Sequence, residues 1–279
     1  YLLRKMFEVG DGDLIKHHES YLQELTFNQF IEYNRLKGLH ASNSVNFYKS
    51  KGLFTPNNKF NYMSFLLSDQ SNISIKVVRF NGKDKASFSE RTEYGSKCLF
   101  YSVDEVINAI KAINVTKIEI VDGIRKETPL FDFEAFREAW INACMHNHWI
   151  DELPPAIYIY DDRIEVFSYG NKPFNLTDEQ FYSGVSSPIN KTLSDMFVSF
   201  KFSEQSGHGV PIIVKKYGRE AFSFKSETVT VTIPFNYIPD FVVGRRIKED
   251  QVDKLTPNQK SILYCIKEHP SITQVEIAN

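Results

Sequence analysis

The sequence predicts an α/β fold in which a mixed β-sheet carries helices on one face. Helical and strand patterns alternate irregularly, and some neighbouring strands are joined as hairpins, which favours this architecture. The chain has 279 residues, 42% of them hydrophobic, so it can bury a sizeable core and form two or more domains. Its 23 Phe and 14 Tyr indicate well-packed layers rather than disorder.

Local patterns define the elements of the first half of the chain. Residues up to about 70 are expected to be mostly helical, and a helix over 59–67 is the best marked of them. The later elements of this half are, in order, a strand over 73–80 closed by Asn81-Gly82, a helix opened by a capping box at 102–105 and running to about 114, and a hairpin of strands 118–121 and 124–129 around Asp122-Gly123.

A helix with two different faces is predicted after Asp132. Asp132 can cap its first amides, and Phe131 and Phe136 occupy the positions of a hydrophobic staple. One stripe of this helix is apolar at helical spacing and is expected to be buried: it contains Phe133, Phe136, Trp140, Ala143 and Cys144.

The other face of this helix carries Glu138, Asn142 and His146, which follow one another at intervals of four residues. A carboxylate, a carboxamide and an imidazole in one row could hold a metal ion and orient a water molecule. On spacing alone, the alternative is an ordinary solvated polar face. The segments that follow the helix favour a functional site.

Those segments combine short strands with glycine. Residues 156–160 and 164–167 are predicted strands, and the second one ends at Ser168-Tyr169-Gly170. Further on, Gly207-His208-Gly209 opens a predicted helix through Tyr217. A Gly-x-Gly at a helix start lets backbone amides approach a phosphate, whose charge the helix dipole favours, although such a sequence alone is more often a plain turn.

Five motifs appear in a fixed order in the second half of the chain. They are Glu138-Ala139-Trp140-Ile141-Asn142-Ala143 with His146, Asp162-Arg163-Ile164-Glu165, Tyr169-Gly170, Ser186-Ser187-Pro188-Ile189-Asn190, and Glu204-Gln205-Ser206-Gly207-His208-Gly209. In this order they resemble the GHKL-type ATPase-like domain of RecG-helicase-related or Schlafen AlbA-type transcriptional regulators. The resemblance extends from about Phe133 to Pro234 and covers the first half of the chain only loosely.

The resemblance implies ATP and Mg²⁺ as cofactors. Glu138 would be the general base on the attacking water, and Asn142 would bind Mg²⁺. Active GHKL domains carry an Asp where this chain has Ser168, and a hydroxyl lacks the charge-assisted strength of a carboxylate. We therefore expect nucleotide binding with at most weak hydrolysis. The other cofactor-binding residues that the resemblance implies are Ser168, Gly170, Gly207 and Gly209.

The C-terminal segment has the pattern of two short helices. Thr256-Pro257 suits an N-cap and a first helical residue, and Thr273–Glu276 is another capping box. This pair resembles the opening of a winged helix-turn-helix, which the family often carries here and which implies DNA as a partner, through a recognition helix mostly beyond Asn279. The alternative is a helical pair that packs on the core.

The sequence predicts four parts along the chain. An N-terminal module over 1–70, related by resemblance to the end of a Schlafen AlbA-type domain, is followed by the GHKL-like domain over 71–240. A linker over 241–254 and the start of the winged helix over 255–279 complete the chain.

Charge, cysteines and hydropathy exclude several classes of protein. The net charge of −2 and the pI of about 6.4 provide no overall basic field for nucleic acid. Cys98, Cys144 and Cys265 are far apart and odd in number, which argues against a disulfide framework or a zinc site and for a reducing cytoplasm. No apolar run approaches the length of about 18 residues that a membrane span needs. No G-x-x-x-x-G-K-[ST] motif occurs, so the chain is not a helicase motor.

The sequence is therefore interpreted as a cytoplasmic, DNA-binding transcriptional regulator with a GHKL-like, ATP-binding domain. Two alternatives stay open: a scaffold or dimerisation module with a degenerate nucleotide pocket, and a slow ATPase. A homodimer is a further partner that the sequence leaves open.

Overall fold

A computed structural model describes residues 13–172, 176–185, 187–203, 208–243 and 254–268. The chain divides into two compact units, Tyr1–Asn236 and Tyr237–Asn279. Within the described residues, no helix combines the length and apolar character needed to cross a membrane.

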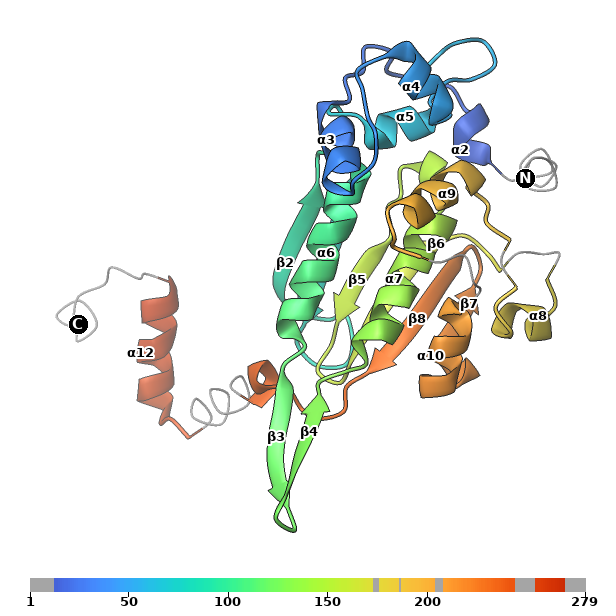
Figure 1. Ribbon diagram of the computed structural model, residues 1–279. Helices are drawn as coiled ribbons and strands as arrows, with labels where there is room; N and C mark the ends of the chain where they lie inside the picture. The colour runs from blue at the N-terminus through green and yellow to red at the C-terminus, as the bar shows by residue number, and fades with distance from the viewer. Residues whose placement is uncertain (1–12, 173–175, 186, 204–207, 244–253, 269–279) are drawn as a thin grey trace. The chain divides into compact units, whose positions relative to one another are not determined.

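The first unit is built on a six-stranded mixed sheet (Figure 1). The strands lie in the order β2-β1-β5-β6-β8-β7, with β1 and β5 parallel and the other described neighbours antiparallel. The mixed sheet predicted from the sequence is confirmed. Its strands are β1 (Ser74–Phe80), β2 (Phe88–Gly95), β5 (Ala156–Ile159), β6 (Arg163–Tyr169), β7 (Phe222–Lys225) and β8 (Thr228–Pro234).

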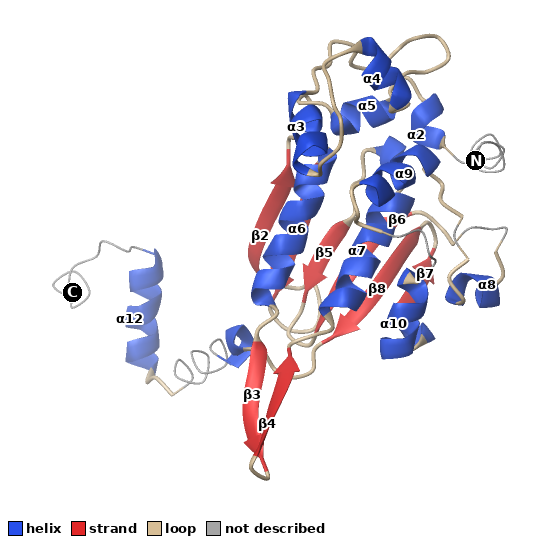
Figure 2. Cartoon of the chain, viewed as in Figure 1, coloured by secondary structure: helices blue, strands red, loops and turns tan. Residues whose placement is uncertain are grey.

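Helices cover one face of this sheet, as predicted (Figures 1 and 2). The central helix α7 (Phe133–His146) packs against β6 and β8, and α6 (Leu99–Ile113) packs against β1 and β2. Helix α10 (Gly209–Tyr217) lies beside α7. The remaining described helices of this half are α8 (Asp178–Tyr182), α9 (Lys191–Ser199) and the short 3₁₀ turns η1 (Trp149–Asp151) and η2 (Arg219–Ala221).

Strand β6 shows how the sequence orients the sheet toward these helices. Ile164, Val166 and Ser168 are buried, while the residues between them are half-buried. Successive side chains of a strand point to opposite faces, so these three share the face that α7 covers. Ser168 is therefore a polar group on an otherwise apolar, covered face.

The N-terminal helices pack onto the sheet domain through aromatic rings. The ring of Phe30 lies 6.5 Å from that of Phe100 in α6, which in turn contacts the ring of Phe200 at 4.6 Å. The domain boundary predicted near residue 70 stays a prediction. The four helices of this part are α2 (Leu14–His17), α3 (Asn28–Leu36), α4 (Val45–Ser50) and α5 (Tyr62–Leu67).

The predicted start of α6 at a capping box is wrong. The helix begins at Leu99, and Ser102 lies inside it with a buried hydroxyl that has no hydrogen-bond partner among the described residues. Leu99 and Phe100 are both buried, so packing of these side chains extends the helix past the residues that local capping chemistry singled out.

The predicted hairpin around Asp122-Gly123 is confirmed as a separate two-stranded sheet of β3 (Thr116–Val121) and β4 (Ile124–Pro129). Asp122 and Gly123 have φ values of 52° and 75°, as a tight two-residue turn with two left-handed residues requires. Figure 2 shows the hairpin extending away from the main sheet.

The second unit contains α12 (Pro257–Glu268). Thr256 caps this helix as predicted: its hydroxyl accepts from the Gln259 amide at 3.4 Å, and the Gln259 side chain accepts from the Thr256 amide at 2.9 Å. The second predicted capping box, Thr273–Glu276, lies outside the described residues, so the winged helix stays a prediction.

Candidate functional site

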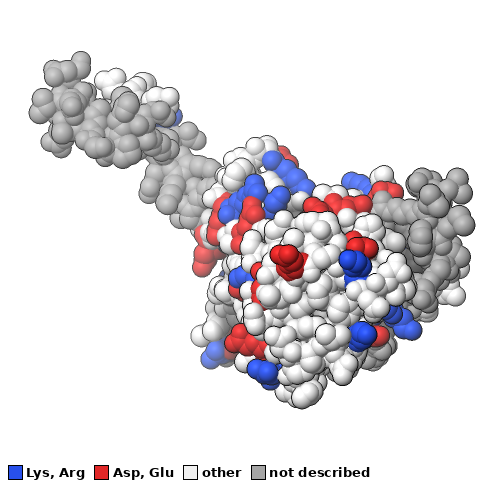
Figure 3. All heavy atoms as spheres, turned by 90° about the horizontal axis from the view of Figure 1, so that it is seen from above, with Lys and Arg blue, Asp and Glu red and all other residues white. Residues whose placement is uncertain are grey.

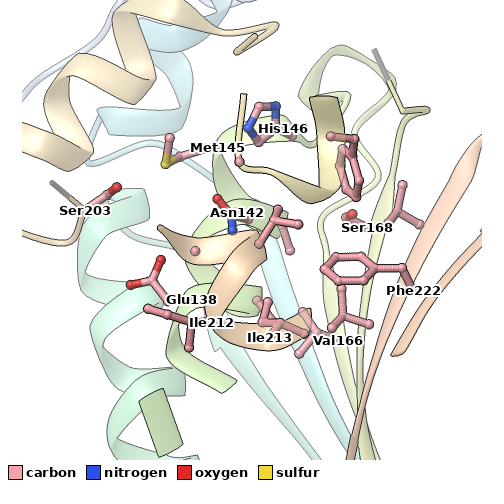
Figure 4. A pocket seen from close by; sticks show the side chains of 18 of the residues that line it. Glu138, Asn142, Met145, His146, Val166, Ser168, Ser203, Ile212, Ile213 and Phe222 are labelled. Atoms are coloured by element: carbon pink, nitrogen blue, oxygen red, sulfur yellow. The ribbon is translucent and has the colours of Figure 1, made fainter. Parts of the chain in front are cut away.

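A cavity of about 380 Å³ lies between α7, α10 and the covered face of the sheet (Figure 4). It brings together predicted site residues that are far apart in the sequence. Gly207 lies outside the described residues. The predicted site residues that line the cavity are Glu138, Asn142, Ser168, Gly170 and Gly209.

The two faces of α7 are arranged as its sequence predicts. The Asp132 carboxylate accepts from the Ala135 amide at 3.0 Å, and the rings of Phe131 and Phe136 are 6.0 Å apart, which forms the cap and the staple. Trp140 on the apolar stripe is fully buried. Phe133 was predicted to be buried with this stripe, but it is only half-buried, because it lies at the first position of the helix. The polar row therefore faces the cavity because the opposite stripe is held in the core.

The C-terminal end of α7 is joined to the end of β6 by hydrogen bonds. The Asn147 side chain accepts from the Tyr169 amide at 2.9 Å, and the His148 amide donates to the Tyr169 carbonyl at 2.9 Å. The Asn190 side chain donates to the carbonyls of Met145 and Asn147 at 3.1 and 3.0 Å. The first two bonds hold the end of α7 to β6, and the two Asn190 bonds hold it to the start of α9. The role of Asn147 was not predicted.

Gly170 lies at this junction, in a backbone conformation that favours glycine. Its φ is 142°, a region that residues with a Cβ rarely adopt. A Cβ there would lie 3.1 Å from the His146 carbonyl oxygen and 3.4 Å from the His148 ring. The glycine of the predicted Tyr169-Gly170 motif is thus favoured by its backbone conformation, and the packing around it is tight.

At the polar end of the cavity, the first turn of α10 lies against the row on α7. A Cβ added at Gly209 would lie 2.7 Å from Glu138 Oε2 and 2.8 Å from Asn142 Nδ2. The Arg137 guanidinium is 3.5 Å from Glu138 Oε1. The first turn of α10 therefore packs directly against the carboxylate of Glu138 and the carboxamide of Asn142, and any larger residue at position 209 would require these two side chains to move.

His146 completes the row and also lines the cavity (Figure 4). Burial lowers the pKa of its imidazole to about 4. The ring is therefore neutral near pH 7 and adds hydrogen-bonding capacity without charge. Its four-residue spacing from Asn142 was the signal that linked it to the site.

The other end of the cavity is apolar and aromatic. Ser168, 7% exposed, is a polar group within this lining. The rings of Phe181 and Phe222 meet edge-to-face at 5.4 Å. Such a lining suits a flat heterocycle, with the serine hydroxyl able to donate or accept one hydrogen bond. Sequence reasoning did not predict the apolar lining residues Val166, Phe181, Ile213, Phe222, Phe224, Val229 and Val231.

The donor set near Asn142 fits a cation that brings most of its own ligands. Among the described residues, no group of three or more His, Cys, Asp or Glu side chains could hold a metal ion. Mg²⁺ commonly takes only one or two protein ligands and completes its shell with water and phosphate oxygens. The Asn142 carboxamide at the wall of the cavity is compatible with that mode and not with a closed, all-protein metal site.

Comparison with known proteins gives a family match for part of the chain. Residues 153–235 match the family described as "Putative ATP-dependent DNA helicase recG C-terminal", so the predicted resemblance is confirmed over this segment. The matched segment contains Ser168, Gly170 and Gly209 but not α7, so Glu138 and Asn142 join it only through the fold. No curated protein matches the chain.

A solved structure shares the fold over nearly the whole chain. The DIP2311 protein from Corynebacterium diphtheriae superimposes with a TM-score of 0.59 at 16% sequence identity. The match covers 98% of this chain and 58% of that one, so this chain spans little more than half the length of that protein.

Proposed function

Because residues 153–235 form a RecG-C-terminal-like, ATPase-type domain, we propose that the cavity beside α7 binds ATP together with Mg²⁺. The observation that supports this most directly is the meeting of Glu138, Asn142 and the start of α10 at Gly209. A helix start that approaches a carboxylate and a carboxamide through a glycine is suited to a phosphate and its counterion.

The two ends of the cavity would contact different parts of the nucleotide. The apolar end would hold the adenine ring, with the Ser168 hydroxyl as its polar contact. At the other end, the Asn142 carboxamide oxygen would be a protein ligand to the metal. Bound Mg²⁺ would supply charge neutralisation to the phosphates. Glu138, kept near Arg137, is placed to accept a proton from a water molecule in the same space.

With Ser168 in this position, we expect the site to bind nucleotide but not to hydrolyse it efficiently. A hydroxyl holds the purine less firmly than the carboxylate of active GHKL domains, because its hydrogen bond is not charge-assisted. Nucleotide would then act mainly by changing the stability or association of the domain. The most catalysis that we propose for this site is slow ATP hydrolysis, with Glu138 as the general base.

Thermal unfolding with and without nucleotide tests the site. We expect ATP with Mg²⁺ at 100 times its Kd to stabilise the protein by about 2.7 kcal/mol. Asn142→Ala should abolish this gain and leave the melting temperature without ligand nearly unchanged, since Asn142 lies opposite the apolar stripe.

The control is Asn57→Ala, an exposed asparagine far from the cavity in sequence, which should respond to ATP like the parent protein. The proposal is contradicted if ATP does not stabilise the parent protein, or if it stabilises the Asn142→Ala protein just as much. Either result would favour the alternative of a scaffold with an empty pocket.

We further propose that the chain is a transcriptional regulator that contacts DNA through a winged helix beginning near Thr256. The capped helix α12 supports this position for the module. The formal net charge is −2, and Lys and Arg are interspersed with Asp and Glu on the described face shown in Figure 3. The first unit thus offers little counterion release to drive DNA binding.

Duplex binding at several salt concentrations tests this proposal. A chain extended past residue 279 to complete the winged helix should bind DNA with a steep salt dependence, since helix-turn-helix proteins read DNA with their second helix. The 279-residue chain should bind at least tenfold more weakly. Tight, salt-sensitive binding that survives removal of residues 255–279 would place the DNA interface elsewhere.

A further inference from the structure

The β3–β4 hairpin exposes apolar side chains on both of its faces. Ile118, Ile120 and Ile124 are 55%, 78% and 71% exposed. A two-stranded hairpin on its own is at most marginally stable in water, and contiguous exposed apolar groups mark interaction surfaces. This projecting element therefore has the composition of a surface that a partner covers.

The hydrogen-bond pattern of the hairpin shows which backbone groups of β3 are free to pair. The Leu130 amide donates to the Val115 carbonyl at 2.9 Å, which fixes Val115 and Leu130 as a hydrogen-bonded pair. Hydrogen-bonded and non-hydrogen-bonded pairs alternate along an antiparallel ladder. The amides and carbonyls of Thr116, Ile118 and Ile120 consequently point away from β4, along an edge that no other described strand occupies.

The charges of the hairpin argue against nucleic acid as the partner. Between Thr116 and Pro129 there are three basic residues (Lys117, Arg125, Lys126) and three acidic ones (Glu119, Asp122, Glu127). The ribbon is therefore neutral overall and offers no counterion release. On β3 itself, Lys117 and Glu119 flank Ile118 symmetrically, and this arrangement is complementary to itself.

We propose that β3 pairs edge to edge with β3 of a second copy of this chain, antiparallel and centred on Ile118. In this register Ile118 meets Ile118 of the second copy, and Thr116 meets Ile120. All three residues use their outward backbone groups. Lys117 lies opposite Glu119 of the second copy, twice across the two-fold axis. The result is a four-stranded sheet that joins Ile118 and Ile120 of both copies on one face.

Neighbouring registers and the other edge are less favourable. If the β3–β3 pair is centred on Lys117, Lys117 lies opposite Lys117 of the second copy; if it is centred on Glu119, Glu119 lies opposite Glu119. Both registers place like charges together, which is destabilising. A β4–β4 pair centred on Lys126 or Glu127 would likewise place two like charges opposite each other. The β4 edge also lacks one hydrogen-bond donor, because Pro129 has no backbone amide hydrogen. The Ile118-centred register of β3 is the one in this set that satisfies both backbone and charge.

Charge reversal with mixing tests the proposal on the 279-residue chain by sedimentation velocity. The parent protein should form a dimer, and Lys117→Glu and Glu119→Lys should each weaken dimerisation at least tenfold, because each creates two like-charged pairs. An equimolar mixture of the two variants should recover the parent's affinity as a heterodimer, since every 117–119 pair is then opposite in charge.

The matched control is Arg125→Glu. It breaks the in-strand Arg125–Glu127 ion pair (2.7 Å) just as Lys117→Glu breaks the Lys117–Glu119 pair (2.7 Å), but it lies on β4 and should leave the dimer unchanged. A monomeric parent protein would overturn the proposal. So would variants that dimerise normally, or a mixture that stays monomeric although each variant is folded by circular dichroism.

Discussion

Trp140→Ala should lower the free energy of unfolding by about 3–5 kcal/mol, the range found when a fully buried tryptophan is truncated. Trp140 is 0% exposed at the contact of α7 with α6, and its indole nitrogen donates to the Val103 carbonyl at 3.3 Å. The substitution leaves a cavity and removes this additional hydrogen bond to the α6 backbone. For a unit of this size, the melting temperature should fall by about 10 °C, which differential scanning calorimetry can measure.

Glu134→Ala on the same helix is the control, because Glu134 is exposed. It should change the free energy of unfolding by no more than about 0.5 kcal/mol. A Trp140→Ala protein that unfolds within about 1 kcal/mol of the parent would mean that the α6–α7 contact does not carry the fold.

Asn190→Asp should be destabilising by about 3–5 kcal/mol at neutral pH, although the two side chains have nearly the same shape. The Asn190 amide group donates to two carbonyls at the end of α7 and is 1% exposed. A carboxylate there would face the Met145 and Asn147 oxygens without a proton to donate. Denaturant unfolding of the two proteins measures the difference.

The pH dependence of this variant provides an independent check. Burial beside carbonyl oxygens raises the pKa of the new carboxyl group above its value in the unfolded chain. The folded state then binds more protons than the unfolded state between the two pKa values, so the deficit should shrink as the pH falls through that window. Asn57→Asp, at an exposed position, should show neither the deficit nor the recovery. A deficit that does not change with pH would point to steric damage.

Local patterns were enough to predict some strands and not others. Residues 73–80 were predicted as a strand and form β1 (Ser74–Phe80), while every residue of β2 (Phe88–Gly95) is exposed or half-buried. An edge strand with few buried residues has no period that distinguishes it from a loop, because its structure comes from pairing with β1. The start of α6 was missed for a related reason: the packing of Leu99 and Phe100 is a long-range effect.

The same division holds for the candidate site. The row of Glu138, Asn142 and His146 follows from spacing within one helix, so the sequence predicts it directly. Ser168 and Gly170 were linked to that row by the order of motifs. The aromatic lining from Phe181 and Phe222 comes from two separate segments with no shared pattern, and only the fold brings them together.

The two faces of α7 differ in how much a substitution there would affect the stability of the fold. Trp140 and its neighbours on the apolar stripe hold the helix in the core, while Glu138 and Asn142 line the cavity on the opposite face. The pocket can therefore be silenced one side chain at a time in a protein that still folds. Descendants of such a domain would keep the architecture as a ready-made framework, open to a new ligand or to none.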